Sequence, residues 1–199
     1  DAFDQSLKLY TDSYLKNLPS RTSETRAVWY RPPTNKFSIL EDLDTMQKLG
    51  INLIFVETWW EGGLLYPNGP VSQRLEFIGW DPLAYIITEA HKRDIEVHAW
   101  LEVFFSGYKK PGELLSTHPD WAAVGLDGHI PVKAEDDKYF IDPAHQEARA
   151  FLTNMFVDMV KKYELDGLHL DYIRYPLGVP MPYGFSLYTQ ELFQKNTGL

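Results

Sequence analysis

The fold is decided by the stretch LDGLHLDYIRYP, residues 165–176, which has the apolar pattern of a buried strand but also carries charge. Side chains alternate along a strand, so His169 and Asp171 share one face while Leu168 and Leu170 share the other. A charge inside a buried strand needs a partner or a ligand, because burying it alone is costly. Asp171 is therefore expected to be a catalytic carboxylate, a ligand-binding group or an acid satisfied within the structure.

Strand-like and helical segments alternate along the rest of the chain. Strands are predicted over three earlier apolar segments: RAVWYRPP (26–33), INLIFVET (51–58) and IEVHAWLEVF (95–104). Helical spacing of apolar residues predicts helices over FSILEDLDTMQKLG (37–50), WDPLAYIITEAHKRD (80–94), DPAHQEARAFLTNMFVDMVKKYE (142–164) and SLYTQELFQKNTGL (186–199). Asp81 and Asp142, each followed by proline, are expected to cap two of these helices. The long connection 105–141 is expected to be functional.

This alternation indicates an α/β protein with a parallel sheet, either doubly wound or part of a (β/α)8 TIM barrel. No G-x-G-x-x-G motif or P-loop follows a strand. Polar residues instead follow the strands at their carboxyl ends, where a barrel has its active site. The prediction is a TIM-barrel-type fold with about the first four β/α units in this chain. Residues 1–25 are expected to form an N-terminal helix and linker, and residues 26–199 the N-terminal part of the barrel domain.

A complete barrel typically has ~250 residues, so further units are expected beyond this chain of 199 residues. The open edges of a half barrel would favour self-association.

The formal net charge of −9 argues against nucleic acid as a partner, and no apolar run approaches the ~20 residues of a membrane span. The absence of cysteine excludes disulfides and thiolate metal sites, and no cofactor or metal is predicted. The aromatic content of 15% is high, and besides core packing an excess of Trp and Tyr suits stacking against sugars or bases.

The candidate site residues gather on the strand faces that would point into the barrel. Glu57, Glu102 and Asp171 are expected to form a ring of acids, with histidines on two of the same strand faces. Trp59 and Trp60 precede two glycines and are expected to be exposed in a loop. Besides the catalytic candidates Asp171 and Glu102, the expected substrate-binding residues are Glu57, Trp59, Trp60, His98, Trp100, His169, Arg174 and Tyr175, with Trp29 and Tyr30 as further aromatic candidates.

Several motifs resemble the bacterial glycosyl-hydrolase-like family related to glycoside hydrolase family 10. They run in order from about Arg26 to the end of the chain, and DGLHLDYIRYP is the most specific of them. The motifs are RAVWY (26–30), LGINLIFVE (49–57), LLYPNG (64–69), VHAWLEVF (97–104), HPDW (118–121), Gly128, YFIDPAHQEARAFL (139–152) and YELDGLHLDYIRYP (163–176). The resemblance implies a TIM barrel that acts on polysaccharide, with a place outside the cell or in the cell envelope of a bacterium.

The same strand is similar to the D-G-x-R-x-D strand of the alpha-amylase superfamily, in which the second aspartate is the nucleophile. Asp166, Gly167 and Asp171 match that pattern, whereas His169 stands where the amylases have arginine. Glycoside hydrolysis needs two carboxylates, one as acid and one as nucleophile or base. Asp171 is expected to supply one, and Glu102 or a carboxylate outside this chain the other.

Three other readings remain open. A non-catalytic carbohydrate-binding barrel would depend on the aromatic residues more than on the acids. A metal-dependent hydrolase or deacetylase would use His98, His169 and Asp171 around zinc, although the sequence has no H-x-H pair and no H-E-x-x-H motif. The half barrel by itself would also be consistent with an inactive fragment.

Overall fold

The structure is a computed structural model that describes residues 2–17, 24–177 and 182–199. Helix α1 (Ala2–Asn17) lies where the N-terminal helix is expected, and residues 18–23 of the expected linker are outside the described residues. The remaining elements are β1 (Ala27–Tyr30), α2 (Lys36–Lys48), β2 (Leu53–Trp60), β3 (Gly63–Leu64), α3 (Pro82–His91), β4 (Glu96–Glu102), β5 (Phe105–Tyr108), α4 (Gly112–Thr117), β6 (Lys138–Phe140), α5 (Gln146–Lys162), β7 (Gly167–Asp171) and α6 (Leu187–Thr197).

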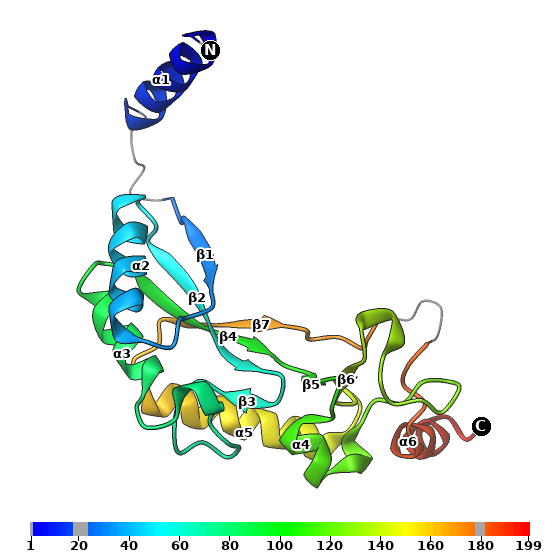
Figure 1. The fold of residues 1–199 in the computed structure, drawn as a ribbon. Coiled ribbons are helices and arrows are strands. Elements are labelled where there is room, and N and C mark those ends of the chain that lie inside the picture. Colours follow the sequence, from blue (N-terminus) through cyan, green and yellow to red (C-terminus); the bar gives the residue numbers. More distant parts are fainter. Residues whose placement is uncertain (1, 18–23, 178–181) are drawn as a thin grey trace.

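The main sheet has the strand order expected of a barrel. Strands β1, β2, β4 and β7 pair in parallel in that order, so each new strand joins the same edge of the sheet (Figure 1). A doubly wound sheet would reverse direction at a switch point, and this sheet does not. The prediction of a TIM-barrel-type fold with four β/α units is confirmed.

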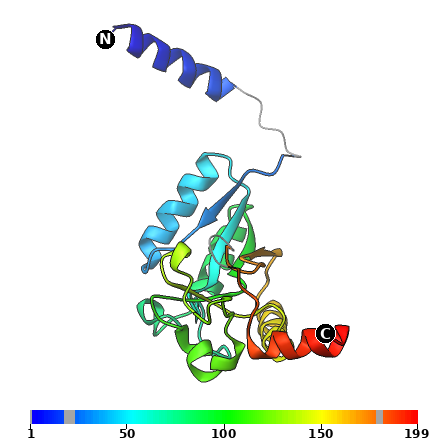
Figure 2. The same ribbon diagram turned by 90° about the vertical axis from the view of Figure 1, so that its right-hand side faces the viewer.

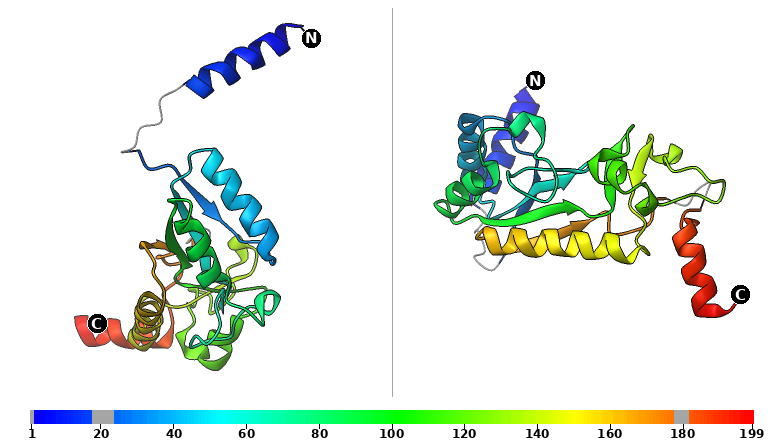
Figure 3. Two further views of the ribbon diagram at one scale, coloured as in Figure 1. Left: turned by 90° about the vertical axis from the view of Figure 1, so that its left-hand side faces the viewer. Right: turned by 90° about the horizontal axis from the view of Figure 1, so that it is seen from below.

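Three helices cover one face of this sheet. Helices α2, α3 and α5 lie on the same side of the strands, and α5 runs alongside them (Figures 1 and 3). The core between sheet and helices includes fully buried Ile54, Val97 and Leu101 on the strands and Leu43 and Ile86 on the helices. Asp81 caps α3 as predicted, since its carboxylate accepts a hydrogen bond from the Ala84 amide at 3.0 Å. The other sheet face is left to hold the polar side chains.

The long connection between β4 and α5 is folded rather than irregular. Strands β5 and β6 pair antiparallel as a separate two-stranded sheet, and α4 lies between them in sequence. Residues 105–140, which comprise these two strands and the long segment between them, are called the inserted hairpin below. The inserted hairpin stands beyond the carboxyl ends of the parallel strands (Figure 1). The connection therefore extends the barrel at the end where a TIM barrel carries its active site.

The expectation that Trp59 and Trp60 are exposed in a loop is wrong, because β2 continues through Trp60. A bulge at Thr58 puts one extra residue into β2, so that Glu57 pairs with Trp100 but Trp59 pairs with Leu101. The bulge turns Trp59 to the helix-covered face, where its side chain is 0% exposed and cannot contact a ligand. Trp60 in turn points to the face that carries Glu57.

Asp142 was expected to cap the helix that follows it, but α5 begins at Gln146, four residues later. The Asp142 side chain is fully buried and binds the C-terminal segment instead. It accepts hydrogen bonds from the hydroxyls of Ser186 at 2.5 Å, Thr189 at 2.6 Å and Tyr175 at 2.9 Å. These contacts attach α6 near the start of α5 (Figure 2).

Asp142→Ala is expected to lower the free energy of unfolding by about 3 kcal/mol, because it leaves several buried hydroxyls without their acceptor. Urea unfolding followed by circular dichroism measures this change. Asp158→Ala, on the exposed side of α5, is the matched control and should change stability by less than about 0.5 kcal/mol. Equal stability of the two variants would show that the Asp142 contacts contribute nothing.

None of the described helices is both long enough and apolar enough to cross a membrane.

Candidate active site

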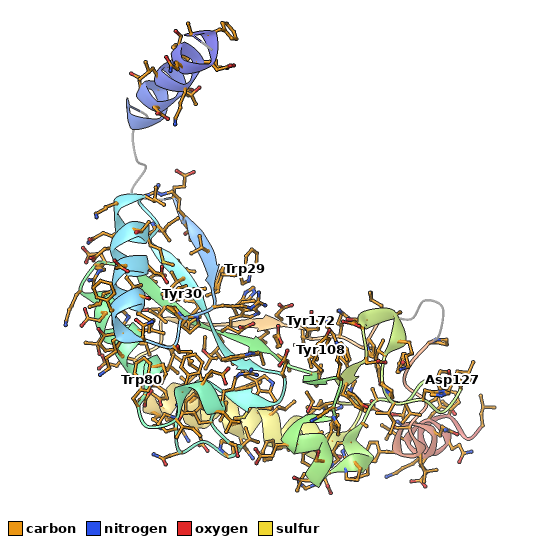
Figure 4. The ribbon with its side chains drawn as sticks, viewed as in Figure 1. Trp29, Tyr30, Trp80, Tyr108, Asp127 and Tyr172 are labelled. Carbon is orange, nitrogen blue, oxygen red and sulfur yellow. The ribbon has the colours of Figure 1, made fainter. Side chains whose placement is uncertain are left out.

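A pocket of about 330 Å³ opens where the parallel strands meet the inserted hairpin. Tyr108 and Tyr172 mark this junction in Figure 4. Strand ends supply one wall of the pocket and the hairpin supplies the other. Its lining residues are Arg31, Glu57, Trp60, Glu61, Glu102, Phe105, Tyr108, Lys138 and Tyr172.

Glu102, the last residue of β4, is the most perturbed acid of the pocket. Only 4% of it is exposed, and in the described part of the chain no donor reaches its Oε2 atom. Burial raises the pKa of Glu102 to about 8, and the nearby charges of Glu57 and Asp171 add to the rise, while Arg31 and Lys138 oppose it. Glu102 is therefore protonated at neutral pH and is able to give a proton to a bound ligand.

Arg31 organises the neighbouring acid, Glu57. The Nε atom of Arg31 donates to both carboxylate oxygens of Glu57, at 2.8 and 2.9 Å. The same guanidinium lies 3.9 Å from Glu102 and stacks over the Trp100 ring at 4.7 Å. Burial raises the pKa of Glu57, although the bond and charge of Arg31 act in the opposite direction. Arg31 thus holds Glu57 against the pocket wall and reaches toward Glu102.

Asp171, the last residue of β7, lies directly beside Glu102 in the strand register. Its Oδ2 atom accepts a hydrogen bond from the indole Nε1 of Trp100 at 3.0 Å, and its Oδ1 atom accepts one from the Tyr172 amide at 2.7 Å. The Tyr172 backbone has a φ of +49°, the left-handed conformation that most side chains avoid. Two N–H groups thus orient the Asp171 carboxylate, and Trp100, which is buried, serves as one of these donors.

The left-handed turn at Tyr172 also ends the strand, so the residues after it leave the pocket. Arg174 pairs with Glu135 of the insertion at 3.1 Å, and the Tyr175 hydroxyl donates to Asp142. Arg174 was expected at the active end of the strand because it follows Asp171 at the carboxyl end. Neither Arg174 nor Tyr175 lines the pocket, and Asp171 lies beside Glu102 without being one of the lining residues.

His98 and His169 lie deeper on the same sheet face and do not line the pocket. His169 accepts a hydrogen bond from the indole of Trp29 at 3.1 Å, and its ring stacks on Phe55 with ring centres 4.3 Å apart. His98 faces Gly167, where an added Cβ would lie 2.7 Å from the imidazole. In the described residues no three His, Asp or Glu side chains gather into a group suited to a metal ion.

Six residues that line the pocket escaped the sequence analysis: Arg31, Glu61, Phe105, Tyr108, Lys138 and Tyr172. Arg31 lies at the carboxyl end of a strand, as Glu57 and Glu102 do, so the strand-end rule itself would have found it. Lys138 lies in the insertion, where no such rule applies. Strand alternation would put Tyr172 on the face of Leu168 and Leu170, away from Asp171, because alternation does not foresee the left-handed backbone at Tyr172.

Comparison with known proteins identifies the family of this chain. The family model of glycosyl hydrolase-like 10 matches residues 21–199. Glycosyl hydrolase DigH of Escherichia coli K12 is 31% identical over 148 residues, which are 67% of this chain and 33% of DigH. Glycosyl hydrolase YngK of Bacillus subtilis is 31% identical over 181 residues, which are 77% of this chain and 34% of YngK. The chain thus spans about a third of the length of these curated relatives.

Solved structures with the same fold include two glycosidases. Alpha-L-fucosidase isoenzyme 2 from Paenibacillus thiaminolyticus aligns with a TM-score of 0.68 at 15% identity, over 88% of this chain and 26% of that chain. The alpha-galactosidase from Lactobacillus brevis aligns with a TM-score of 0.53 at 18% identity, over 73% of this chain and 20% of that chain. These likenesses bear on the fold alone, whereas the family match covers nearly the whole sequence. The chain belongs to the glycosyl hydrolase-like 10 family.

Proposed function

We propose that the protein hydrolyses glycosidic bonds of a polysaccharide or oligosaccharide, with Glu102 as general acid and Asp171 as the second carboxylate. The observation that carries this proposal is the pairing of two unlike acids on adjacent strands. Glu102 is buried, receives no hydrogen bond at its Oε2 atom from any residue that the structure describes, and keeps its proton, whereas Asp171 accepts hydrogen bonds from two N–H groups. Two neighbouring carboxyl groups with such different surroundings, one buried and protonated and the other held by N–H donors, are typical of glycosidases.

In the proposed reaction Glu102 gives its proton to the glycosidic oxygen as the bond from that oxygen to the anomeric carbon breaks. In a retaining reaction Asp171 bonds to the anomeric carbon, and water, which gives a proton to the Glu102 carboxylate, then releases the sugar from Asp171. In an inverting reaction Asp171 takes a proton from the water that attacks the anomeric carbon. Negative charge on Glu57 favours the protonated form of Glu102 before the reaction, and Arg31 keeps Glu57 in place.

The aromatic wall of the pocket supports a sugar ligand. Trp60, Phe105, Tyr108 and Tyr172 line the same cavity as Glu57 and Glu102. Aromatic rings provide flat apolar surfaces against the C–H faces of sugars, while charged neighbours bind the hydroxyls. Relatives called glycosyl hydrolases support the same class of reaction.

The pH dependence of hydrolysis tests the role of Glu102. Because Glu102 acts in its protonated form and its pKa is raised to about 8, kcat/KM should be maintained at neutral pH and fall about tenfold per pH unit well above 8. The measurement is reducing-sugar release from a panel of polysaccharides by the full-length protein between pH 5 and 10. A fall that begins near pH 5 would rule out Glu102 as the acid.

A further inference from the structure

Lys138 brings a positive charge into the pocket from outside the parallel sheet. It is the first residue of β6 in the inserted hairpin, and its side chain is 23% exposed. Its Nζ atom donates a hydrogen bond to the Tyr172 hydroxyl at 2.9 Å. The ammonium also lies over two aromatic rings, 4.9 Å from the centre of Tyr172 and 5.3 Å from that of Phe105. These contacts fix the ammonium in the pocket that Glu102 also lines.

The surrounding charges leave this ammonium available to Glu102. Glu135 lies 3.7 Å from Lys138, but it is already bound by Arg174 at 3.1 Å and by the Leu177 amide at 2.7 Å. The other cation lining the described pocket, Arg31, is bound to Glu57 through both carboxylate oxygens.

Glu102 therefore meets two kinds of neighbour. Glu57 and Asp171 repel a negative charge on it, whereas Lys138 and Arg31 attract one. Although burial lowers the pKa of Lys138, its hydrogen bond to Tyr172 and the charges of Glu135 and Glu102 raise it above the usual value, so Lys138 remains an ammonium.

We propose that Lys138 is a positioning residue of the reaction, whose ammonium stabilises the negative charge that appears on Glu102 as this acid gives its proton to the leaving group. The inference rests on the proposed function and extends it to the inserted hairpin. The proton moves from Glu102 to the glycosidic oxygen, the bond from that oxygen to the anomeric carbon breaks, and the remaining carboxylate faces the ammonium. The hairpin thus takes part in the chemistry as well as enclosing the substrate.

Removing this charge should make Glu102 a weaker acid. In Lys138→Met, the titration midpoint of Glu102 should rise by about half a pH unit or more, because an attracting charge is lost. Carbon-13 NMR of the glutamate-labelled full-length protein measures the midpoint, and the signal missing in Glu102→Gln identifies the residue. The fall of kcat/KM at alkaline pH should move upward with it, and kcat at neutral pH should fall about tenfold.

Two variants separate charge from structure. Lys138→Arg keeps the charge and should return the midpoint to within about 0.2 of the wild-type value. Tyr172→Phe removes only the hydroxyl that holds Lys138 and should shift the midpoint in the same direction by a smaller amount, which tests the idea should Lys138→Met not fold. Lys133→Met, an exposed lysine of the same insertion paired with Asp137, should leave it unchanged.

An unchanged Glu102 midpoint in both Lys138→Met and Tyr172→Phe would overturn the inference. The proposed function fails by a different result, namely wild-type turnover in Glu102→Gln. The NMR titration does not depend on turnover, so the two failures are distinguishable.

Discussion

Asp171→Asn is expected to lower kcat for glycan hydrolysis by roughly 10³-fold or more. Asparagine has nearly the same shape, and its carbonyl oxygen still accepts one of the hydrogen bonds from Trp100 and Tyr172. It lacks the charge needed to attack the anomeric carbon or to take a proton from water. Reducing-sugar release by the full-length protein measures the rate, and calorimetric titration with an oligosaccharide product measures binding, which should persist.

Asp166→Asn is the matched control for this prediction. Asp166 lies just before the same strand, but its carboxylate accepts hydrogen bonds from the Val97 amide at 2.7 Å and pairs with His91 at 2.9 Å, at the opposite end of the sheet. Its loss should affect stability more than turnover, with kcat within about threefold of the wild type. Full turnover in Asp171→Asn would identify Asp171 as an acid that is satisfied within the structure.

Glu102→Gln is expected to lower hydrolysis of natural glycans by roughly 10²- to 10⁴-fold, the range of general acid catalysis. The loss should depend on the leaving group. A dinitrophenyl glycoside leaves as a stable anion and needs no proton, so its hydrolysis should fall much less than that of an oligosaccharide. The fall in kcat/KM above pH 8 should also vanish, because the group responsible for it is gone.

Glu96→Gln provides the control on the same strand. Glu96 is the first residue of β4, at the end away from the pocket, and its side chain is exposed. Substrates with good and poor leaving groups should be hydrolysed by this variant at wild-type rates. An equal loss on both kinds of substrate in Glu102→Gln would contradict a role as general acid and would indicate a role in binding.

Much of the fold follows from periodicity and local signals. The four parallel strands and the helices between them lie where apolar spacing predicts them, and the Asp81–Pro82 pair does begin α3. The prediction fails where a residue with the right local signal has a better partner far along the chain. Asp142 also precedes a proline, yet its carboxylate binds hydroxyls more than thirty residues away, and α5 starts later.

The candidate site was predictable in outline. The rule that polar residues at strand ends mark the active end of a barrel located Glu57, Glu102 and Asp171, and the structure brings the three acids together. The expectation that Trp59 is exposed in a loop failed, because β2 continues past it and the bulge at Thr58 turns its side chain to the helix-covered face. The strand-end rule also missed Lys138, which enters the pocket from the inserted hairpin.

The sequence by itself determined the order of strands and helices, the strand face that carries the acids and the family. These properties are local, since they depend on the spacing of apolar residues and on short motifs. The tertiary structure alone decided which acid keeps its proton and which is oriented by N–H donors. That difference arises from burial and from pairs distant in sequence, Trp100 with Asp171 and Arg31 with Glu57, because electrostatic free energies depend on separation in space and on exclusion of water.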